Sequence, residues 1–115
     1  MAQTVWVVRS TVAANADFSA ILKWTQEKFG LAQASAYTQT LIAAMSNLCA
    51  GPDVFGSKLR VELGGDIYTL HVARQGRAGR HFLVFRASNA KGQQVIEILR
   101  ILHDSMDLKR HLSLH

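Results

Sequence analysis

Residues 95–102 are the feature that most restricts the fold, because this aliphatic run contains only two charged residues, Glu97 and Arg100. A run of this length, rich in β-branched residues, is typical of a strand buried on both faces of a sheet. His103 ends the run, and residues 104–107 offer side chains that can cap a helix. The segment therefore predicts a central strand followed by a short basic helix over residues 108–112.

Two helices are expected near the start of the chain, after a short strand over residues 4–9. Asn15 or Asp17 can cap the first helix, and Gly30 can end it in a left-handed conformation. The second helix is expected over residues 32–49, where Gly51-Pro52 stops it. The single-glycine link predicts an antiparallel helical hairpin whose apolar stripes pack on the sheet. The stripe positions are Phe18, Ile21, Leu22, Thr25 and Phe29 in the first helix, and Ala34, Tyr37, Leu41, Ala44, Met45 and Leu48 in the second.

The remaining strands follow one another closely. Residues 59–63 could form a short edge strand, and residues 67–74 and 80–87 are expected to be longer strands, with Tyr68, Leu70 and Val72 on one face. The turns at residues 75–79 and 88–92 contain glycine, which favours an antiparallel meander over a parallel sheet. We therefore predict one α+β domain spanning residues 1–115. Its order is strand, helix, helix, three strands and helix, with an antiparallel sheet and the helical hairpin on one face.

Composition excludes several classes of protein. With 49% hydrophobic and 18% charged residues, a chain of this length can bury a real core. Cys49 is the single cysteine, so it allows no internal disulfide, and its apolar neighbours indicate a buried, inert thiol. We find no metal-ligand spacing, no nucleotide-binding loop, no apolar run long enough to span a membrane and no signal pattern. The expectation is a cytoplasmic protein that needs neither metal nor cofactor.

Charge is concentrated in the second half of the chain. Residues 1–57 contain three basic and three acidic side chains, whereas residues 58–115 contain ten and five, together with all five histidines. The net charge of +5 therefore belongs to the second half, which favours an acidic protein segment, nucleic acid or a nucleoprotein as partner. A solvated sheet face with basic turns is the alternative explanation.

Two motifs resemble a known family. Residues 71–86 read H-x-A-R-x-G-x-x-x-R-H-F-x-V-F-R, and residues 98–112 read I-L-R-I-L-H-D-S-M-D-L-K-R-H-L. Together they resemble the RelE/ParE toxins of bacterial toxin–antitoxin pairs, and most closely the ParE branch, in which a strand ends in L-H before a D-(L/V)-x-x-x-L helix. The resemblance extends over nearly the whole chain in the order of its elements.

This resemblance implies a type II toxin that binds and inhibits DNA gyrase. It also implies a hetero-oligomer with an acidic, ParD-like antitoxin, through which alone the toxin would contact operator DNA. Because RelE relatives cleave messenger RNA on the ribosome, a ribosome-dependent endoribonuclease is the first alternative. An interaction module that retains only antitoxin binding is the second.

Candidate residues differ between these functions. A ribonuclease would need Arg86, Arg100 and His103 as a phosphate-handling cluster. Neither tyrosine lies near the C-terminal segment, which argues against this function. The alternative for His103 is a local role, in which it hydrogen-bonds the backbone or caps the final helix. A gyrase inhibitor needs no catalytic residue. We expect its target-binding cations to be Arg77, Arg80, Lys109 and Arg110, which could alternatively be a solvated turn and helix-end charges. The expected antitoxin-binding residues are Leu22, Trp24, Phe29, Tyr37 and Leu41, whose alternative place is the core.

Overall fold

The aliphatic run forms β5 (Gln93–His103), an interior strand of a five-stranded sheet with the order β1-β5-β4-β3-β2. The computed structural model describes residues 5–90 and 92–111, without the side chains of Ala90 and Lys109. Ile96, Ile98 and Ile101 are buried in the main core, whereas Leu102 is buried in a second cluster. The prediction of a strand buried on both faces is therefore confirmed.

The sheet is mixed. β3 (Ile67–His71), β4 (His81–Ala90) and β5 form the predicted antiparallel meander, and β2 (Lys58–Leu59) adds antiparallel to β3. The expectation of a wholly antiparallel sheet is corrected by β1 (Val7–Ser10), which pairs parallel to β5. Two parallel strands must be joined by a long crossover connection. The connection from β1 to β5 begins with the helical hairpin. The first strand also extends to Ser10, one residue beyond the predicted end, while Thr4 lies outside the described residues.

α1 (Val12–Phe29) and α2 (Leu31–Asn47) form the predicted hairpin, and a single 3-10 turn, η1 (Leu48–Ala50), follows them. Thr11 caps α1, so the predicted caps Asn15 and Asp17 are wrong. Because β1 ends at Ser10, the helix begins immediately after it, and the Thr11 hydroxyl oxygen accepts a hydrogen bond from the Ala14 N–H at 3.0 Å. Gly30 ends α1 at a positive φ of 93°, but its ψ of 171° is not the left-handed helical value that we expected.

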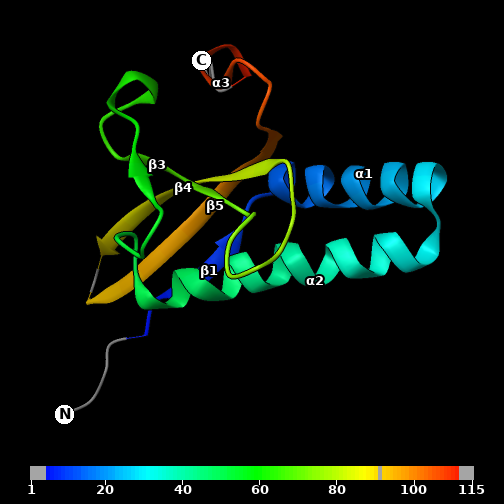
Figure 1. The fold of residues 1–115 in the computed structure, drawn as a ribbon. Helices are drawn as coiled ribbons and strands as arrows, with labels where there is room; N and C mark the ends of the chain where they lie inside the picture. Colours follow the sequence, from blue (N-terminus) through cyan, green and yellow to red (C-terminus); the bar gives the residue numbers. More distant parts are fainter. Residues whose placement is uncertain (1–4, 91, 112–115) are drawn as a thin grey trace.

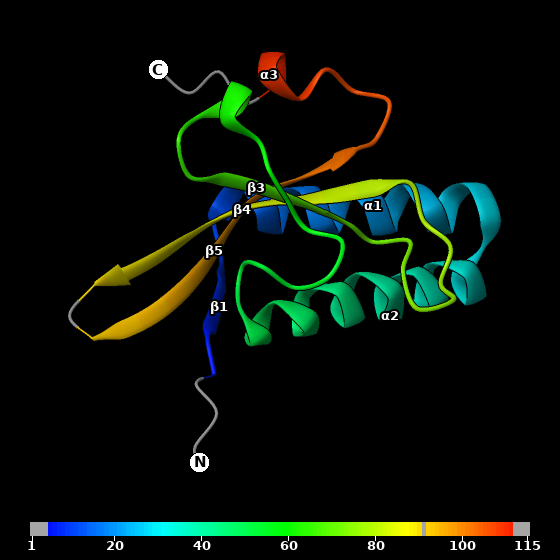
Figure 2. The same ribbon diagram turned by 60° about the vertical axis from the view of Figure 1, so that its left-hand side comes forward.

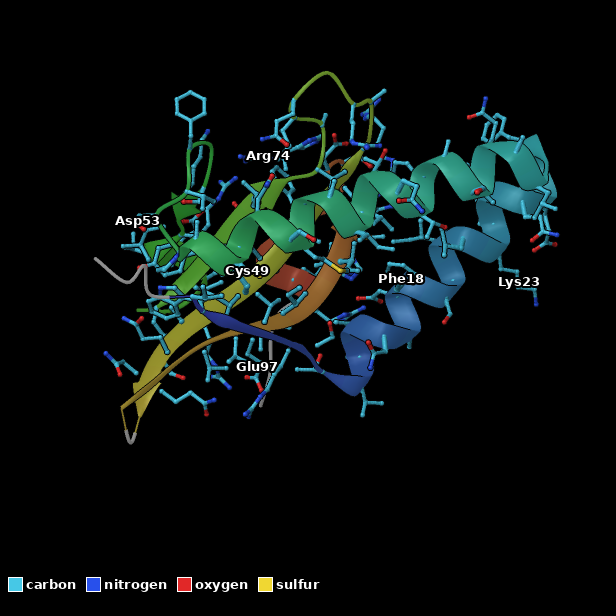
Figure 3. All side chains as sticks on the ribbon, turned by 90° about the horizontal axis from the view of Figure 1, so that it is seen from below. Phe18, Lys23, Cys49, Asp53, Arg74 and Glu97 are labelled. Atoms are coloured by element: carbon cyan, nitrogen blue, oxygen red, sulfur yellow. The ribbon has the colours of Figure 1, made fainter. Side chains whose placement is uncertain are left out.

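Figure 1 shows that α1 and α2 cover one face of the sheet and that the tip of the hairpin extends beyond the sheet. In Figure 3, Phe18 lies on the inner side of α1, whereas Lys23 points away from the sheet near the tip. The buried core between helices and sheet includes Leu41, Leu48, Leu70, Val72, Leu83, Phe85, Ile96 and Ile98. Cys49 is half-buried, which corrects the expectation of a buried thiol.

A bulge in β5 aligns its apolar residues with the two cores. Val84 pairs with Arg100, but the next residue, Phe85, pairs with Ile98, so Leu99 is the extra residue. The bulge shifts the alternation of side chains by one position. Ile98 and Ile101 therefore both face the hairpin, although they are three residues apart.

The opposite face of the sheet is covered at one end by two short helices, η2 (Val61–Leu63) and α3 (Leu108–His111), which lie together in Figure 2. Leu63 and Leu108 pack against Val84 and Leu102 there. The predicted edge strand over residues 59–63 is wrong beyond Leu59, because the chain leaves the edge to cover this cluster. The predicted end of the last helix, Leu112, lies outside the described residues.

The β4–β5 connection is shorter than expected. β4 continues to Ala90, and Asn89 pairs with Gln94, so the turn predicted for residues 88–92 is mostly strand. Within the described ranges, no helix has the length and apolarity needed to cross a membrane.

Candidate functional site

Three histidines meet at the end of the sheet where β3 and β5 finish and β4 begins. His81 and His103 are opposite each other in the β4–β5 register, and their ring centroids are 5.3 Å apart in an edge-to-face arrangement. His71 lies on β3 and contacts the Phe82 ring edge-on, with 5.0 Å between centroids. The topology therefore brings together histidines from three strands.

Tyr37 reaches this end of the sheet from α2. The Arg80 backbone N–H donates to the Tyr37 hydroxyl oxygen at 3.1 Å, which leaves the hydroxyl proton to donate to His81 Nδ1 at 2.7 Å. Burial, followed by the nearby His103, lowers the pKa of His81 to about 4. Burial also raises the pKa of Tyr37. At neutral pH both groups are therefore uncharged and joined by a hydrogen bond.

Asp104 joins this cluster to the last helix. Its carboxylate accepts from Arg80 Nε at 3.1 Å and from His71 Nε2 at 2.9 Å, and Arg80 Nη2 lies 3.0 Å away. The Ala73 N–H donates to His71 Nδ1 at 3.0 Å, so the ring proton is on Nε2 and faces Asp104. The Arg80 and His71 hydrogen bonds hold the pKa of Asp104 well below its usual range. The residue that follows β5 is thus anchored to β3 and to the β3–β4 loop.

The three ribonuclease candidates are on neighbouring strands but bind different partners. Arg86 donates to Glu97 at 3.0 Å, and Arg100 donates from two nitrogens to Asp17 of α1 at 2.7 and 3.0 Å. The hydrogen bond with Asp17 raises the pKa of Arg100. His103 Nδ1 is 2.7 Å from the hydroxyl of Ser105. Arg86 is also five residues along β4 from the position opposite His103, which is about 16 Å at the usual rise of a strand.

A pocket of about 410 Å³ lies between the helical hairpin and the β3–β4 loop. Figures 1 and 2 both show this loop bending over α2, and Arg74 marks its start in Figure 3. Gly79 allows the close approach, since a Cβ there would lie 2.6 Å from Val72 Cγ2 and 3.0 Å from the Tyr37 hydroxyl. Of the described residues that line the pocket, only Arg80 is charged; the others include Thr25, Phe29, Tyr37, Thr40 and Ala78.

The residues expected to bind the antitoxin fall into two groups. Trp24 and Phe29 are 55% and 63% exposed at the hairpin tip, where their rings make an edge-to-face contact at 5.7 Å. Leu22 and Tyr37 are partly buried against the core. Leu41 is completely buried, so it is a core residue and cannot contact a partner in this conformation.

The expected target-binding cations also occupy two regions. Arg77 is exposed on the β3–β4 loop, and Arg80 is exposed but bound to Asp104. Arg110 is exposed on α3, and its backbone N–H lies 3.4 Å from the Asp107 carboxylate. Lys109 belongs to α3, but its side chain lies outside the described residues.

Asp104 and the Tyr37–His81 pair could not be recognised from the sequence as parts of one cluster. Asp104 and His71 are 33 residues apart, and Tyr37 and His81 are 44 apart, so no local spacing connects them. The one available signal was the concentration of histidines in the second half of the chain. Among the described residues, no group of three histidine, cysteine or acidic side chains is arranged to hold a metal ion.

Comparisons with known proteins show which family this chain matches. Residues 8–108 match the family described as ParE toxin of type II toxin–antitoxin system, parDE. Proteins named Toxin ParE1 from two Mycobacterium tuberculosis strains, CDC 1551 / Oshkosh and ATCC 25618 / H37Rv, are each 29% identical over 100 residues. The matched region covers 87% of this chain and 91% of theirs. A chain from the structure titled "Chromosomal ParDE TA system from P. aeruginosa" has the same fold, with a TM-score of 0.60 and 23% identity over 87% of this chain and 97% of that chain. The chain described here belongs to the ParE toxin family of type II toxin–antitoxin systems.

Proposed function

We propose that this toxin acts in the cytoplasm by binding and inhibiting DNA gyrase, without catalysis, and that a cognate acidic antitoxin neutralises it. The proposal rests on family membership together with a basic second half and two exposed basic regions, the β3–β4 loop and α3. Such surfaces suit an acidic protein or a nucleoprotein partner.

The observation that best supports action by binding, without catalysis, is that two of the three nuclease candidates form ion pairs within the chain. Arg86 and Arg100 are both bound to carboxylates of the same chain, so their charges are partly neutralised where a phosphate would need them. The separation of Arg86 from His103 along β4, about 16 Å, also exceeds the reach of a shared phosphate group. Docking of a protein partner requires no such cluster.

The hairpin tip supports a ParD-like antitoxin as the second partner. Trp24 and Phe29 form an exposed aromatic pair, and Lys23 and Lys28 are exposed on the same helix. An apolar patch bordered by cations suits an amphipathic acidic segment. We propose that the resulting hetero-oligomer contacts operator DNA only through the antitoxin.

The test compares two double charge reversals on purified protein. Lys109→Glu with Arg110→Glu should weaken inhibition of gyrase supercoiling at least tenfold and leave antitoxin binding less affected. Lys23→Glu with Lys28→Glu is the matched control on α1, which should weaken antitoxin binding instead. The α1 pair should keep thermal stability close to that of the wild type, because Lys23 and Lys28 are exposed and exposed charges contribute little. Thermal melting of the α3 pair, measured beside it, separates loss of inhibition from loss of folding. Full inhibition by the α3 variant would move the target-binding surface to the β3–β4 loop around Arg77.

Ribosome-dependent cleavage of messenger RNA is a second candidate, favoured by one specific observation. Tyr37, which is distant in sequence, hydrogen-bonds to His81 and to the Arg80 backbone, and the His81 ring contacts that of His103. Tyrosine, histidine and arginine can supply proton transfer and charge stabilisation in phosphodiester cleavage.

Expression without antitoxin separates the candidates, when DNA damage and messenger RNA cleavage are scored in the same cells. Cleavage that is lost in Tyr37→Phe and His103→Ala variants with unchanged melting would support the nuclease. Growth arrest with DNA damage and intact messages would support gyrase. Neither effect, with antitoxin binding retained, would indicate an interaction module.

A further inference from the structure

Arg80 belongs to two structural features at once. Its guanidinium group binds Asp104, the first residue after β5, and Arg80 also lines the pocket between the hairpin and the β3–β4 loop. The Arg80 side chain is 69% exposed, whereas that of Asp104 is only 19% exposed. A ligand in the pocket can therefore contact the exposed Arg80 side chain while Asp104 stays hydrogen-bonded to His71.

The pocket fits an apolar side chain followed by a carboxylate. Its walls are formed by Phe29, Ala36 and Tyr37 on the hairpin side and by Ala78 and Gly79 on the loop side. Arg80 is the charged group at this site, and Arg77 is exposed on the same loop. This charge favours an acidic occupant, and the antitoxin in the proposed function is such a partner.

We propose that the antitoxin inserts an apolar side chain into this pocket and that a neighbouring carboxylate takes Arg80 from Asp104. The exchange loosens the anchor of the segment that leads to α3. Neutralisation then acts on the proposed target-binding helix through Arg80, in addition to any part of the surface that the antitoxin covers. This inference rests on the proposed function, because it needs an acidic antitoxin.

The exchange is energetically accessible. Because Arg80 is mostly exposed, solvent screens its ion pair with Asp104, and a pair of this kind gives about a fivefold preference for the paired state. After the exchange, Asp104 keeps its hydrogen bond from His71 and its backbone N–H bond to the Arg80 carbonyl oxygen at 2.8 Å. The segment is therefore released in part, without loss of the fold.

The first test measures the affinity of a purified ParD-like antitoxin that forms a complex with this toxin on co-expression. Asp104→Asn removes the competitor for Arg80, so it should tighten binding about threefold, whereas Arg80→Ala should weaken it. Glu97→Gln is the matched control, since it removes an equal charge from the exposed Arg86 pair, far from the pocket. If Asp104→Asn binds no more tightly than Glu97→Gln, the exchange is refuted.

Hydrogen exchange of the wild-type complex provides an independent measurement, because it needs no substitution that could alter the fold. The N–H groups of Ser105 and Met106 bond to His103 in the free protein. They should exchange at least threefold faster in the complex if Asp104 is loosened, and unchanged or slower exchange would overturn the proposal. Absence of any complex at moderate salt would instead contradict the proposed antitoxin itself, so the two failures are distinguishable.

Discussion

Asp17 should be one of the most sensitive polar positions in this toxin. β1 ends at Ser10, so no strand among the described residues pairs with the edge of β5 beyond Ile98 on that side. The Asp17 carboxylate replaces the missing strand, because it accepts from the Ile101 N–H at 2.9 Å as well as from Arg100. Asp17→Ala removes both interactions at a side chain that is only 16% exposed.

The expected cost follows from these two interactions. An unsatisfied, partly buried backbone N–H costs about 1–3 kcal/mol. The loss of the Arg100 pair adds about 0.5–1 kcal/mol, because Arg100 is 29% exposed and regains some hydration. The total of about 1.5–4 kcal/mol corresponds to a decrease in Tm of about 6–16 °C for a domain of this size.

Urea unfolding and thermal melting of three variants would test this account. Asp17→Asn keeps an acceptor for the Ile101 N–H and should lose about half as much free energy of unfolding as Asp17→Ala. Glu97→Gln is the control, since its pair with Arg86 is exposed and should change stability by less than about 0.5 kcal/mol. If Asp17→Ala is no less stable than Glu97→Gln, Asp17 does not complete the edge of β5.

Three further results are expected. Burial and the nearby His103 lower the pKa of His81 from its ordinary value of 6.5 to about 4, so the unfolded chain binds more protons between these values. Stability should therefore fall by about 1–3 kcal/mol as the pH drops from 6.5 to 4, and His81→Gln should flatten this slope in urea unfolding. Gly79→Ala should cost about 1–3 kcal/mol, measured by the same unfolding assay, because its Cβ would lie 2.6 Å from Val72 Cγ2. Trp24→Ser with Phe29→Ser should reduce antitoxin affinity at least tenfold in a titration, with a change in Tm of a few degrees at most, because both rings are more than half exposed. Ser19→Ala is a control on the same helix, α1, where this side chain is exposed.

The parts of the fold that depend on local periodicity could be predicted from the sequence. The aliphatic run of β5 and the apolar stripes of α1 and α2 are periodic in the sequence itself, and the β4–β5 connection is short as predicted. The β3–β4 connection is the loop of residues 72–80, longer than the predicted turn of residues 75–79, because β3 ends at His71 and not at residue 74. Burial of Leu41 is also a consequence of its stripe. The same stripe does not show where the sheet ends beneath the hairpin, so the sequence could not separate the fully buried Leu41 from the exposed Trp24 and Phe29 among the expected antitoxin-binding residues.

The features that depend on distant partners could not be predicted in this way. Asp17 has the sequence context of a helix cap, yet its partners are 83 and 84 residues away on β5. The parallel pairing of β1 likewise follows from the open edge of β5 and not from any turn. The Asp104 cluster depends on residues from β3, the β3–β4 loop and β5 meeting at one end of the sheet. The chemistry of the individual side chains does not predict which residues distant in sequence will be in contact in the fold.

The position of β5 between β1 and β4 also affects how the toxin emerges during synthesis. β5 is the last strand in chain order, yet it joins the first strand to the meander and contributes to both cores. A nascent chain that lacks β5 has helices and hairpin strands without the surface on which they pack. Folding must therefore wait until nearly all of the elements have left the ribosome, and the long separation of β1 from β5 in the chain makes that closure slow. A chain that ends before β5 should therefore remain unfolded, and a newly completed chain should pass through a slow closing step before it is folded.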